Sequence, residues 1–167
     1  MNPVIILENI RSCYNVGSIL RTADALWRDV AIVWYTPNPC TQPKVAKTSL
    51  GAEESVHIED FAQEVVDGIV PDSALAIAAY KERGYTVIAA EVYENALALD
   101  QWSDEFRSAS EGNKKSPLIA VIVGNEVTGV EQSTLQIVDA VVYIPMRWVK
   151  ESLNVSQTAA MFMRELQ

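Results

Sequence analysis

One apolar run, Leu118–Val123, constrains the fold of this chain more than any other feature. Its six residues, Leu-Ile-Ala-Val-Ile-Val, carry no polar side chain. Such a continuous run suits a strand of a parallel sheet that is covered on both faces. Gly124, Asn125 and Glu126 follow at once. We therefore expect a buried parallel strand with a polar loop at its carboxyl end.

The rest of the chain alternates between strand-like and helix-like segments, which predicts an α/β fold with a mostly parallel sheet. Strands are expected at Val4–Leu7, Val30–Tyr35, Ser55–Ile58, Tyr85–Ala90 and Ala140–Ile144. Helices are expected at Val16–Leu26, at residues 59–83 in two pieces broken at Pro71, at Glu131–Ile137 and at Ser152–Leu166. Residues 43–54 are predicted to be mainly loop, and residues 94–111 irregular or weakly helical. Ligands bind beyond the carboxyl ends of parallel strands, so the loops after the first strand and the last two strands are candidate sites.

The acidic charge is concentrated in the middle of the chain. The net charge of −9 argues against nucleic-acid binding, because phosphate contacts need Lys and Arg. However, residues 53–111 hold 14 acidic and 3 basic side chains, whereas residues 1–52 hold 3 acidic and 5 basic ones. The outer thirds of the chain are therefore free to bind RNA.

Few residues suit a metal site or a disulfide framework. The chain has two cysteines, Cys13 and Cys40, and one histidine, His57, which excludes the usual zinc sites. No apolar run approaches the roughly 20 residues that cross a bilayer. The N-terminus indicates a strand rather than a signal peptide. We expect a cytoplasmic protein without a metal or a membrane segment, and one domain over residues 1–167.

Each of the three candidate loops carries polar residues that suit ligand binding. Free amides at the start of the first helix could receive an anion, and Arg21 lies further along it. Glycine at 124 and 129 allows close approach of a ligand. Each loop also has a purely structural interpretation: Asn15 could cap the first helix, the second loop could be a turn, and the Ser152–Ser156 segment could cap the last helix.

Taken together and in this order, the three loops resemble the motifs of the SpoU/TrmH branch of the SPOUT methyltransferases. The first motif matches Asn15, Gly17 and Arg21, and the second matches Gly124, Asn125, Glu126 and Gly129. The third matches Ile144–Met146 and Ser152–Ser156. Pro43–Glu53 is also similar to a loop of this family. The resemblance covers nearly the whole chain.

The resemblance implies a C-terminal trefoil knot, a rare exception to the rule against knots. It also implies S-adenosylmethionine as the cofactor, bound largely by backbone groups in the knotted loops. Carried over to this sequence, the cofactor-binding residues are Ala90, Gly124, Asn125, Ile144, Met146 and Leu153. Proteins of this kind are homodimers whose active site is completed across the interface, which involves the first and last helices.

The implied activity is 2′-O-methylation of a ribose in RNA. The catalytic residues carried over are Arg21, Asn15, Glu126, Ser152 and Asn154. A guanidinium is a poor base, so we expect Arg21 to bind phosphate and to stabilise the developing alkoxide. Transfer RNA is favoured over ribosomal RNA, because the chain shows no additional RNA-binding domain. A base-nitrogen methyltransferase is a nearby alternative, and a generic nucleotide-binding domain is disfavoured by the lack of Gly-x-Gly-x-x-Gly.

Three of the four tryptophans stand where the family has glycine: Trp27, Trp34 and Trp148. Trp148 follows Ile-Pro-Met-Arg in the cofactor loop, and two placements of its large indole are possible. In the first, the indole fills the pocket and the protein is a catalytically silent RNA-binding or dimeric scaffold. In the second, the indole points outward. A third hypothesis is that the source organism reads one codon as glycine and that it is translated here as tryptophan.

Overall fold

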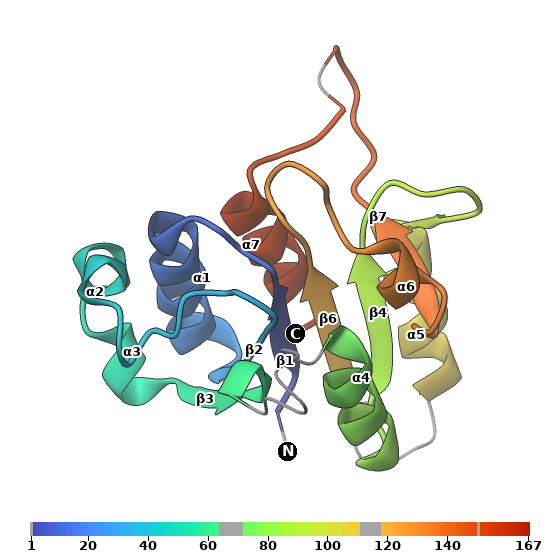
Figure 1. Ribbon diagram of the computed structural model, residues 1–167. Helices are drawn as coiled ribbons and strands as arrows, with labels where there is room; N and C mark the ends of the chain where they lie inside the picture. Colours follow the sequence, from blue (N-terminus) through green and yellow to red (C-terminus); the bar gives the residue numbers. More distant parts are fainter. Residues whose placement is uncertain (1, 64–71, 111–117, 150) are drawn as a thin grey trace.

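A single parallel sheet organises the chain, as the sequence predicts. The computed structural model describes residues 2–63, 72–110, 118–149 and 151–167. Within them seven strands lie in the order β3-β2-β1-β6-β4-β7-β5, and every pair is parallel (Figure 1). The strands are β1 (Val4–Glu8), β2 (Asp29–Val33), β3 (His57–Asp60), β4 (Thr86–Ala90), β5 (Leu97–Ala98), β6 (Ile119–Val123) and β7 (Ala140–Tyr143).

Helices cover both faces of this sheet. They are α1 (Cys13–Leu26), α2 (Pro43–Ser49), α3 (Ala52–Ser55), the 3-10 turn η1 (Phe61–Gln63), α4 (Ser73–Glu82), α5 (Leu99–Ser110), α6 (Gln132–Leu135) and α7 (Val155–Glu165). One core cluster joins the sheet to α1, α2, α5 and α7, and a second joins its other face to η1 and α4. The segment between β7 and α7 extends beyond the sheet at the top of Figure 1.

The central strands explain the two cores. Successive side chains of a strand point to opposite faces, so a strand covered on both sides is apolar throughout. In β1, Ile5 and Leu7 enter the first core and Val4 and Ile6 the second. All five residues of β6 are buried as well. The apolar run Leu118–Val123 therefore lies in the middle of the sheet, next to β1.

One prediction about the outer segments was wrong, and another was right only in part. Residues 43–54 form α2 and α3 instead of a loop. Residues 97–110, expected to be irregular or weakly helical, form β5 and the helix α5. Both helices depend on tertiary burial that local sequence does not show. The α5 side chains Trp102 and Ser103 are buried, and Trp102 stacks on Phe106 at 4.6 Å between ring centroids. Of the two predicted pieces of 59–83, the second is α4, while residues 64–71 lie outside the described part.

Gly17 allows α2 to pack directly against α1. A Cβ atom there would lie 2.1 Å from Thr48 Oγ1 and 2.6 Å from the Val45 carbonyl oxygen. Only glycine lets α2 approach α1 so closely. Thr48 Oγ1 also donates to the Tyr14 carbonyl oxygen at 3.3 Å. The short α2 helix is thus held directly against the start of α1.

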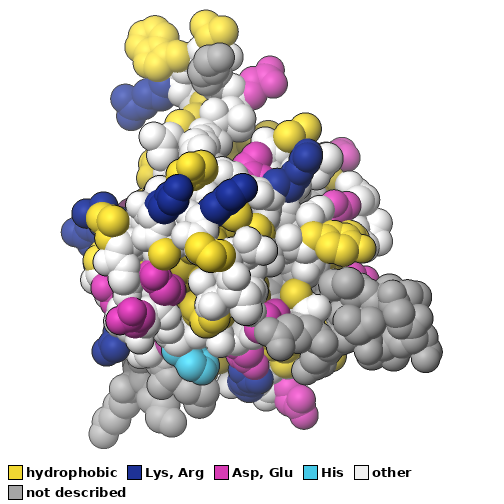
Figure 2. Space-filling model, turned by 60° about the vertical axis from the view of Figure 1, so that its left-hand side comes forward, with side chains coloured by type: hydrophobic (Ala, Val, Ile, Leu, Met, Phe, Trp, Pro, Cys, Tyr) yellow, Lys and Arg dark blue, Asp and Glu magenta, His cyan; other side chains and the backbone are white. Residues whose placement is uncertain are grey.

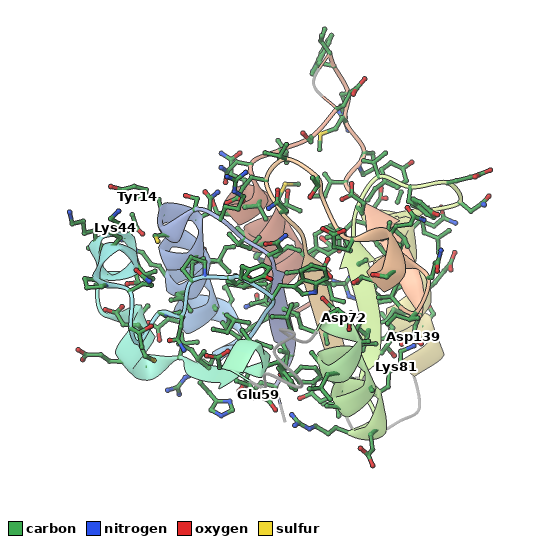
Figure 3. The ribbon with its side chains drawn as sticks, viewed as in Figure 1. Tyr14, Lys44, Glu59, Asp72, Lys81 and Asp139 are labelled. Atoms are coloured by element: carbon green, nitrogen blue, oxygen red, sulfur yellow. The ribbon has the colours of Figure 1, made fainter. Side chains whose placement is uncertain are left out.

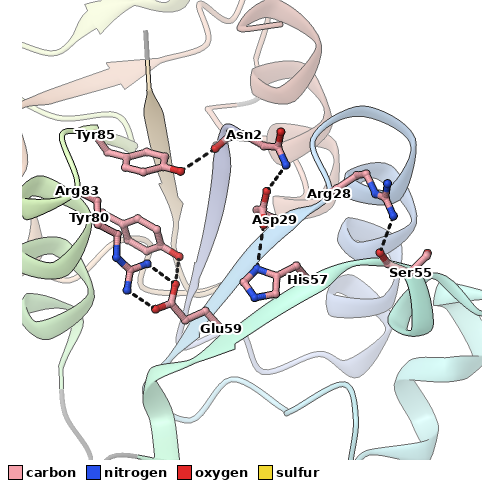
Figure 4. Close-up of polar contacts among 9 residues, drawn as sticks. All are labelled: Asn2, Arg28, Asp29, Ser55, His57, Glu59, Tyr80, Arg83 and Tyr85. Atoms are coloured by element: carbon pink, nitrogen blue, oxygen red, sulfur yellow. Dashed lines mark hydrogen bonds and ion pairs between the residues drawn. The ribbon is translucent and has the colours of Figure 1, made fainter. Parts of the chain in front are cut away.

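Polar contacts at the amino ends of the strands tie the sheet together on the side away from the candidate loops (Figure 4). Asp29 accepts a hydrogen bond from Asn2 Nδ2 at 2.7 Å, and its other oxygen lies 2.9 Å from His57 Nδ1. Glu59 pairs with both terminal nitrogens of Arg83, which holds the pKa of Glu59 below its ordinary value. The single histidine is therefore part of a structural network.

Within the described residues, no helix is long and apolar enough to cross a membrane. The same residues contain no group of three or more His, Cys, Asp or Glu side chains arranged to hold a metal ion.

Candidate active site

Two of the three predicted loops, those after β6 and β7, line a cleft beyond the carboxyl ends of β6, β4 and β7, and the loop after β1 hydrogen-bonds to Glu126 of this cleft. Its volume is about 350 Å³, within the range of small-ligand sites. All six predicted cofactor-binding residues line it: Ala90, Gly124, Asn125, Ile144, Met146 and Leu153. Glu126, Ser152 and Asn154 of the predicted catalytic set line it too. Strands that are distant in sequence are neighbours in the sheet, which brings these loops to one edge.

The loop after β6 folds back on itself at its two glycines. The backbone amides of Asn125 and Gly129 each donate to the other residue's carbonyl oxygen, at 3.0 and 2.9 Å. A Cβ atom on Gly124 would lie 2.3 Å from backbone atoms of Gly129 and Val130. Gly129 has a φ of +73°, a conformation that favours glycine. The spacing Gly-Asn-Glu-x-x-Gly therefore describes a closed turn that presents Glu126 at its tip.

Glu126 joins this turn to the loop after β1. One carboxylate oxygen accepts hydrogen bonds from the Ser12 amide at 3.0 Å and from Asn15 Nδ2 at 2.9 Å. The other accepts from the Arg11 amide at 2.9 Å. Partial burial acts to raise the pKa of Glu126, but these three hydrogen bonds outweigh it and hold the pKa below its ordinary value. Glu126 is therefore an ionised carboxylate whose acceptor sites are mostly filled.

The third loop completes the network through Asn154. Asn154 Nδ2 donates to Asn15 Oδ1 at 3.2 Å, so Asn15 lies between Glu126 and Asn154. Asn154 is also the N-cap of α7, because its Oδ1 accepts from the Ser156 amide at 2.9 Å. Asn15 does not cap α1; that position belongs to Ser12, whose hydroxyl accepts from the Asn15 amide. The Asn15 side chain is thereby left for the network.

Arg21 lies outside this assembly. It is exposed, it does not line the cleft, and it forms no hydrogen bond or ion pair with the described residues. Arg21 follows Asn15 by six positions on α1, which places it about 9 Å along the helix and on another face. Within one chain, the structure brings together four of the five predicted catalytic residues and leaves Arg21 apart; its role stays a prediction.

Comparison with known proteins identifies the family to which this chain belongs. The profile of the SpoU rRNA Methylase family matches residues 2–164. This chain belongs to that family. A tRNA (guanosine(18)-2'-O)-methyltransferase from Thermus thermophilus is 32% identical over 164 residues, covering 98% of this chain and 73% of that protein. The protein of the same name from Aquifex aeolicus is 27% identical, covering 98% and 68%.

Solved structures show the same fold. The AdoMet-bound rRNA methyltransferase from Sinorhizobium meliloti has a TM-score of 0.77 at 20% identity, covering 98% of this chain. This chain spans 55% of the length of the Sinorhizobium meliloti protein. The Aquifex aeolicus TrmH/SpoU tRNA modifying enzyme has a TM-score of 0.73 at 21% identity, and this chain spans 72% of its length. The family uses S-adenosylmethionine, abbreviated AdoMet in such names. The trefoil knot that the family's fold implies stays a prediction.

The cleft suits S-adenosylmethionine in both shape and charge. Apolar side chains of β6, β7 and the third loop offer a surface for a purine, and these include Val123, Val142 and Ile144. Among the described lining residues three are carboxylates, Glu91, Glu126 and Glu151, and none is Lys or Arg. A cleft lined by one sign of charge attracts the opposite sign. The methyl donor carries a positive sulfonium, so the residues present fit it.

The tryptophans at the family's glycine positions leave the cleft open. Trp148 is 89% exposed and does not line the cleft, which contradicts a blocked pocket. Trp34 has a φ of +55°, a conformation that suits glycine. The indole nitrogens of Trp27 and Trp34 are buried without a hydrogen-bond partner among the described residues. Both features are unfavourable for tryptophan, and weighing the native protein by mass spectrometry would decide whether glycine stands there.

Sequence reasoning missed a buried carboxylate at the carboxyl end of β1. Glu8, the last residue of β1, is fully buried and accepts hydrogen bonds from the Ser73 and Thr134 hydroxyls. Its second oxygen accepts from the Glu131 amide at 3.0 Å. It therefore links β1 to the starts of α4 and α6. Glutamate directly after an apolar strand was the available signal.

Glu8 should make the stability of the protein depend on pH. Burial raises the pKa of its carboxyl, and its hydrogen bonds offset this only in part. The folded state therefore holds this proton more tightly, and the resulting stability is lost as pH rises from the ordinary pKa through the folded-state value. Wild type should lose free energy of unfolding between mildly acidic pH and about pH 8, because Glu8 ionises. Glu8→Gln has no carboxyl at this position, so its stability relative to wild type should rise over the same range. Urea unfolding at both pH values measures this.

The control is Glu94→Gln, which alters an exposed carboxyl. Its free energy of unfolding should change with pH by the same amount as that of wild type. Equal pH dependence in wild type and Glu8→Gln would show that Glu8 does not titrate as described.

Proposed function

We propose that this chain transfers the methyl group of S-adenosylmethionine to a ribose 2′-hydroxyl of RNA, with transfer RNA as the substrate. The observation that carries the proposal is the network Glu126–Asn15–Asn154, which joins all three motifs at the cofactor cleft. The Thermus thermophilus and Aquifex aeolicus relatives, which each match 98% of the chain, are named tRNA (guanosine(18)-2'-O)-methyltransferases. The open cleft argues against a silent scaffold. Residues 1–167 then act as one methyltransferase domain, in the cytoplasm.

Incubating the purified protein with tRNA transcripts and radiolabelled S-adenosylmethionine tests this function. Label should enter RNA, and mapping of ribose methylation should locate it at a 2′-hydroxyl. Label on a base nitrogen would replace the proposal by the base-methylating alternative. No incorporation into any RNA class, with the cofactor bound, would support the scaffold.

The chemistry requires an activated hydroxyl placed in line with the methyl group. When bound, S-adenosylmethionine supplies an electrophilic methyl group and leaves as the neutral thioether. The ribose oxygen forms a bond to the methyl carbon as the carbon–sulfur bond breaks, and the hydroxyl proton passes to solvent water. Glu126 is not the base, because three N–H donors occupy it and its pKa is lowered. Glu126 instead fixes Asn15, and the pair positions the loop that faces the ribose.

Arg21 acts as an electrostatic group in this proposal. Its guanidinium cannot take a proton at neutral pH, but it can bind the neighbouring phosphate and stabilise the negative charge that develops on the ribose oxygen. Arg21 does not line the cleft of its own chain, and a homodimer would explain this, because Arg21 could then reach the cleft of the other copy. We propose that α1 and α7, which pack on each other, form the interface and that Arg21 of one copy completes the site of the other.

A cationic surface beside the network suits the RNA backbone. Of the ten Lys and Arg residues in the described part of the chain, only Lys81, Arg83 and Arg107 form ion pairs. Lys81 lies in α4, Arg83 directly follows α4, and Arg107 lies in α5. The five cations of residues 1–52 are unpaired among the described residues. Figure 2 shows Lys and Arg side chains in a row across the face that α1 and α2 form, with hydrophobic side chains between them.

Lys44 and Lys47 of α2 are central to this surface, and both are exposed. Tyr14, which is 58% exposed, lies beside them and precedes Asn15 of the network. Figure 3 shows Tyr14 and Lys44 on the same side of the molecule, while Lys81 and Asp139 pair on the opposite side. Exposed aromatic rings stack on unpaired bases, and lysines bind phosphates. The surface therefore provides an RNA path that leads to the cleft.

Reversing these charges should weaken RNA binding without affecting the cofactor. We expect Lys44→Glu/Lys47→Glu to lose about tenfold to a hundredfold in tRNA affinity and to lower the salt dependence by about two counterions. Fluorescence anisotropy with labelled tRNA across a salt series measures both. The matched control, Lys81→Glu/Arg107→Glu, makes the same change in net charge on α4 and α5. Equal losses in the two variants would refute a localised RNA surface.

A further inference from the structure

A carboxylate at the end of β4 faces the cofactor cleft without a role in the network described above. Glu91 lines the cleft directly after Ala90. Its backbone amide donates to the Val142 carbonyl oxygen of β7 at 3.1 Å, which fixes its position between β4 and β7. No Lys or Arg of the described residues pairs with it. This carboxylate therefore has no cationic partner among the described residues.

Two backbone amides orient the Glu91 carboxylate. One oxygen accepts from the Val92 amide at 2.9 Å, and the other accepts from the Val130 amide at 2.9 Å. Val130 follows the closed turn of the second motif, so Glu91 connects the β4 edge of the cleft to that turn. A carboxylate has about four acceptor positions, and the two amides occupy two of them. One position on each oxygen is left for a ligand.

Gly129 makes room for this carboxylate. A Cβ atom on Gly129 would lie 2.1 Å from Glu91 Oε2 and 3.0 Å from its carboxyl carbon. The second glycine of the motif therefore permits both the turn itself and the close approach of Glu91. The result is a carboxylate that is held by two hydrogen bonds and packed on a glycine, at a cleft that suits a nucleoside.

We propose that Glu91 accepts hydrogen bonds from the two ribose hydroxyls of S-adenosylmethionine and thereby selects a ribonucleoside cofactor. A pair of adjacent hydroxyls matches a carboxylate with one free acceptor position on each oxygen. Other α/β nucleotide-binding proteins use a carboxylate after a parallel strand for a ribose hydroxyl. The inference rests on the proposed function, since it assigns a residue within the same cofactor cleft.

Calorimetry with S-adenosylhomocysteine and its 2′-deoxy and 3′-deoxy analogues tests this assignment without any need for turnover. Wild type should bind the ribonucleoside about tenfold or more tightly than either analogue, because each analogue leaves one acceptor position of a charged group unpaired. In Glu91→Ala the three ligands should bind with nearly equal affinity. Glu91→Gln should retain part of the preference, because its amide oxygen still accepts one hydrogen bond.

The matched control is Glu151→Gln, which removes another carboxylate from the same cleft. It should keep the full preference for the ribonucleoside. If Glu91→Ala weakens all three ligands by the same factor, Glu91 only holds the Val130 turn and the inference fails. If wild type binds none of the ligands, the proposed methyltransferase function fails as well, so the two failures are distinguishable.

Discussion

Replacement of Arg21 by alanine should abolish methylation of RNA while S-adenosylmethionine still binds with wild-type affinity. The guanidinium lies outside the cleft of its own chain, so its removal leaves the cofactor surface intact. It is also exposed and forms no hydrogen bond or ion pair with the described residues, so stability should change by no more than about 0.5 kcal/mol. Loss of one group that stabilises the developing oxyanion costs about a hundredfold to a thousandfold in rate. Single-turnover methylation and calorimetry measure the two quantities.

Arg21→Lys provides the control for charge. Lysine keeps a positive charge but lacks the planar pair of donors that matches a phosphate, so partial activity is expected. Full turnover by Arg21→Ala would exclude Arg21 from the reaction. Loss of cofactor binding in that variant would show instead that the residue supports the cleft.

Mixing two inactive variants should restore activity if the active site is shared between copies. Arg21→Ala lacks the cationic group, and Glu126→Gln weakens the network that positions Asn15. In a symmetric dimer, a mixed pair holds one site with both residues intact and one site with neither. Random exchange makes about half the dimers mixed, so about a quarter of wild-type activity should return.

The alternative arrangement gives a clearly different result. If Arg21 acts within its own chain, each site of a mixed dimer lacks one residue and no activity returns. Mixing Arg21→Ala with a second preparation of itself controls for exchange. Size-exclusion chromatography must show a dimer; a monomer that is fully active would contradict the shared site.

Local sequence was sufficient for the sheet and for the residues at its edge. A run with no polar side chain, such as Leu118–Val123, can be stable only where both faces are covered, and it forms β6 at the centre of the sheet. The polar residues after β1, β6 and β7 were correctly expected near one another, because parallel strands end at a common edge. The resemblance of the motifs to those of the SpoU/TrmH family implied the chemistry, and all six predicted cofactor residues line the cleft.

Local sequence was insufficient where an element depends on a distant partner. The helix α2 forms against Gly17, and α5 forms because Trp102 and Phe106 find an apolar surface. The N-cap of α1 is Ser12, which leaves Asn15 for the network. None of these outcomes follows from periodicity, because each is decided by contacts between residues far apart in the chain.

The amino-acid sequence by itself determined the parallel α/β sheet, the three loops and the residue types that they offer. Only the tertiary structure decided which of those side chains meet: Glu126, Asn15 and Asn154 share hydrogen bonds, Glu91 lines the cleft, and Arg21 does not. The physical reason is that the spacing of apolar and polar residues along the chain indicates whether a segment forms a strand or a helix. The direction of a side chain across a cleft depends instead on the packing of the whole sheet.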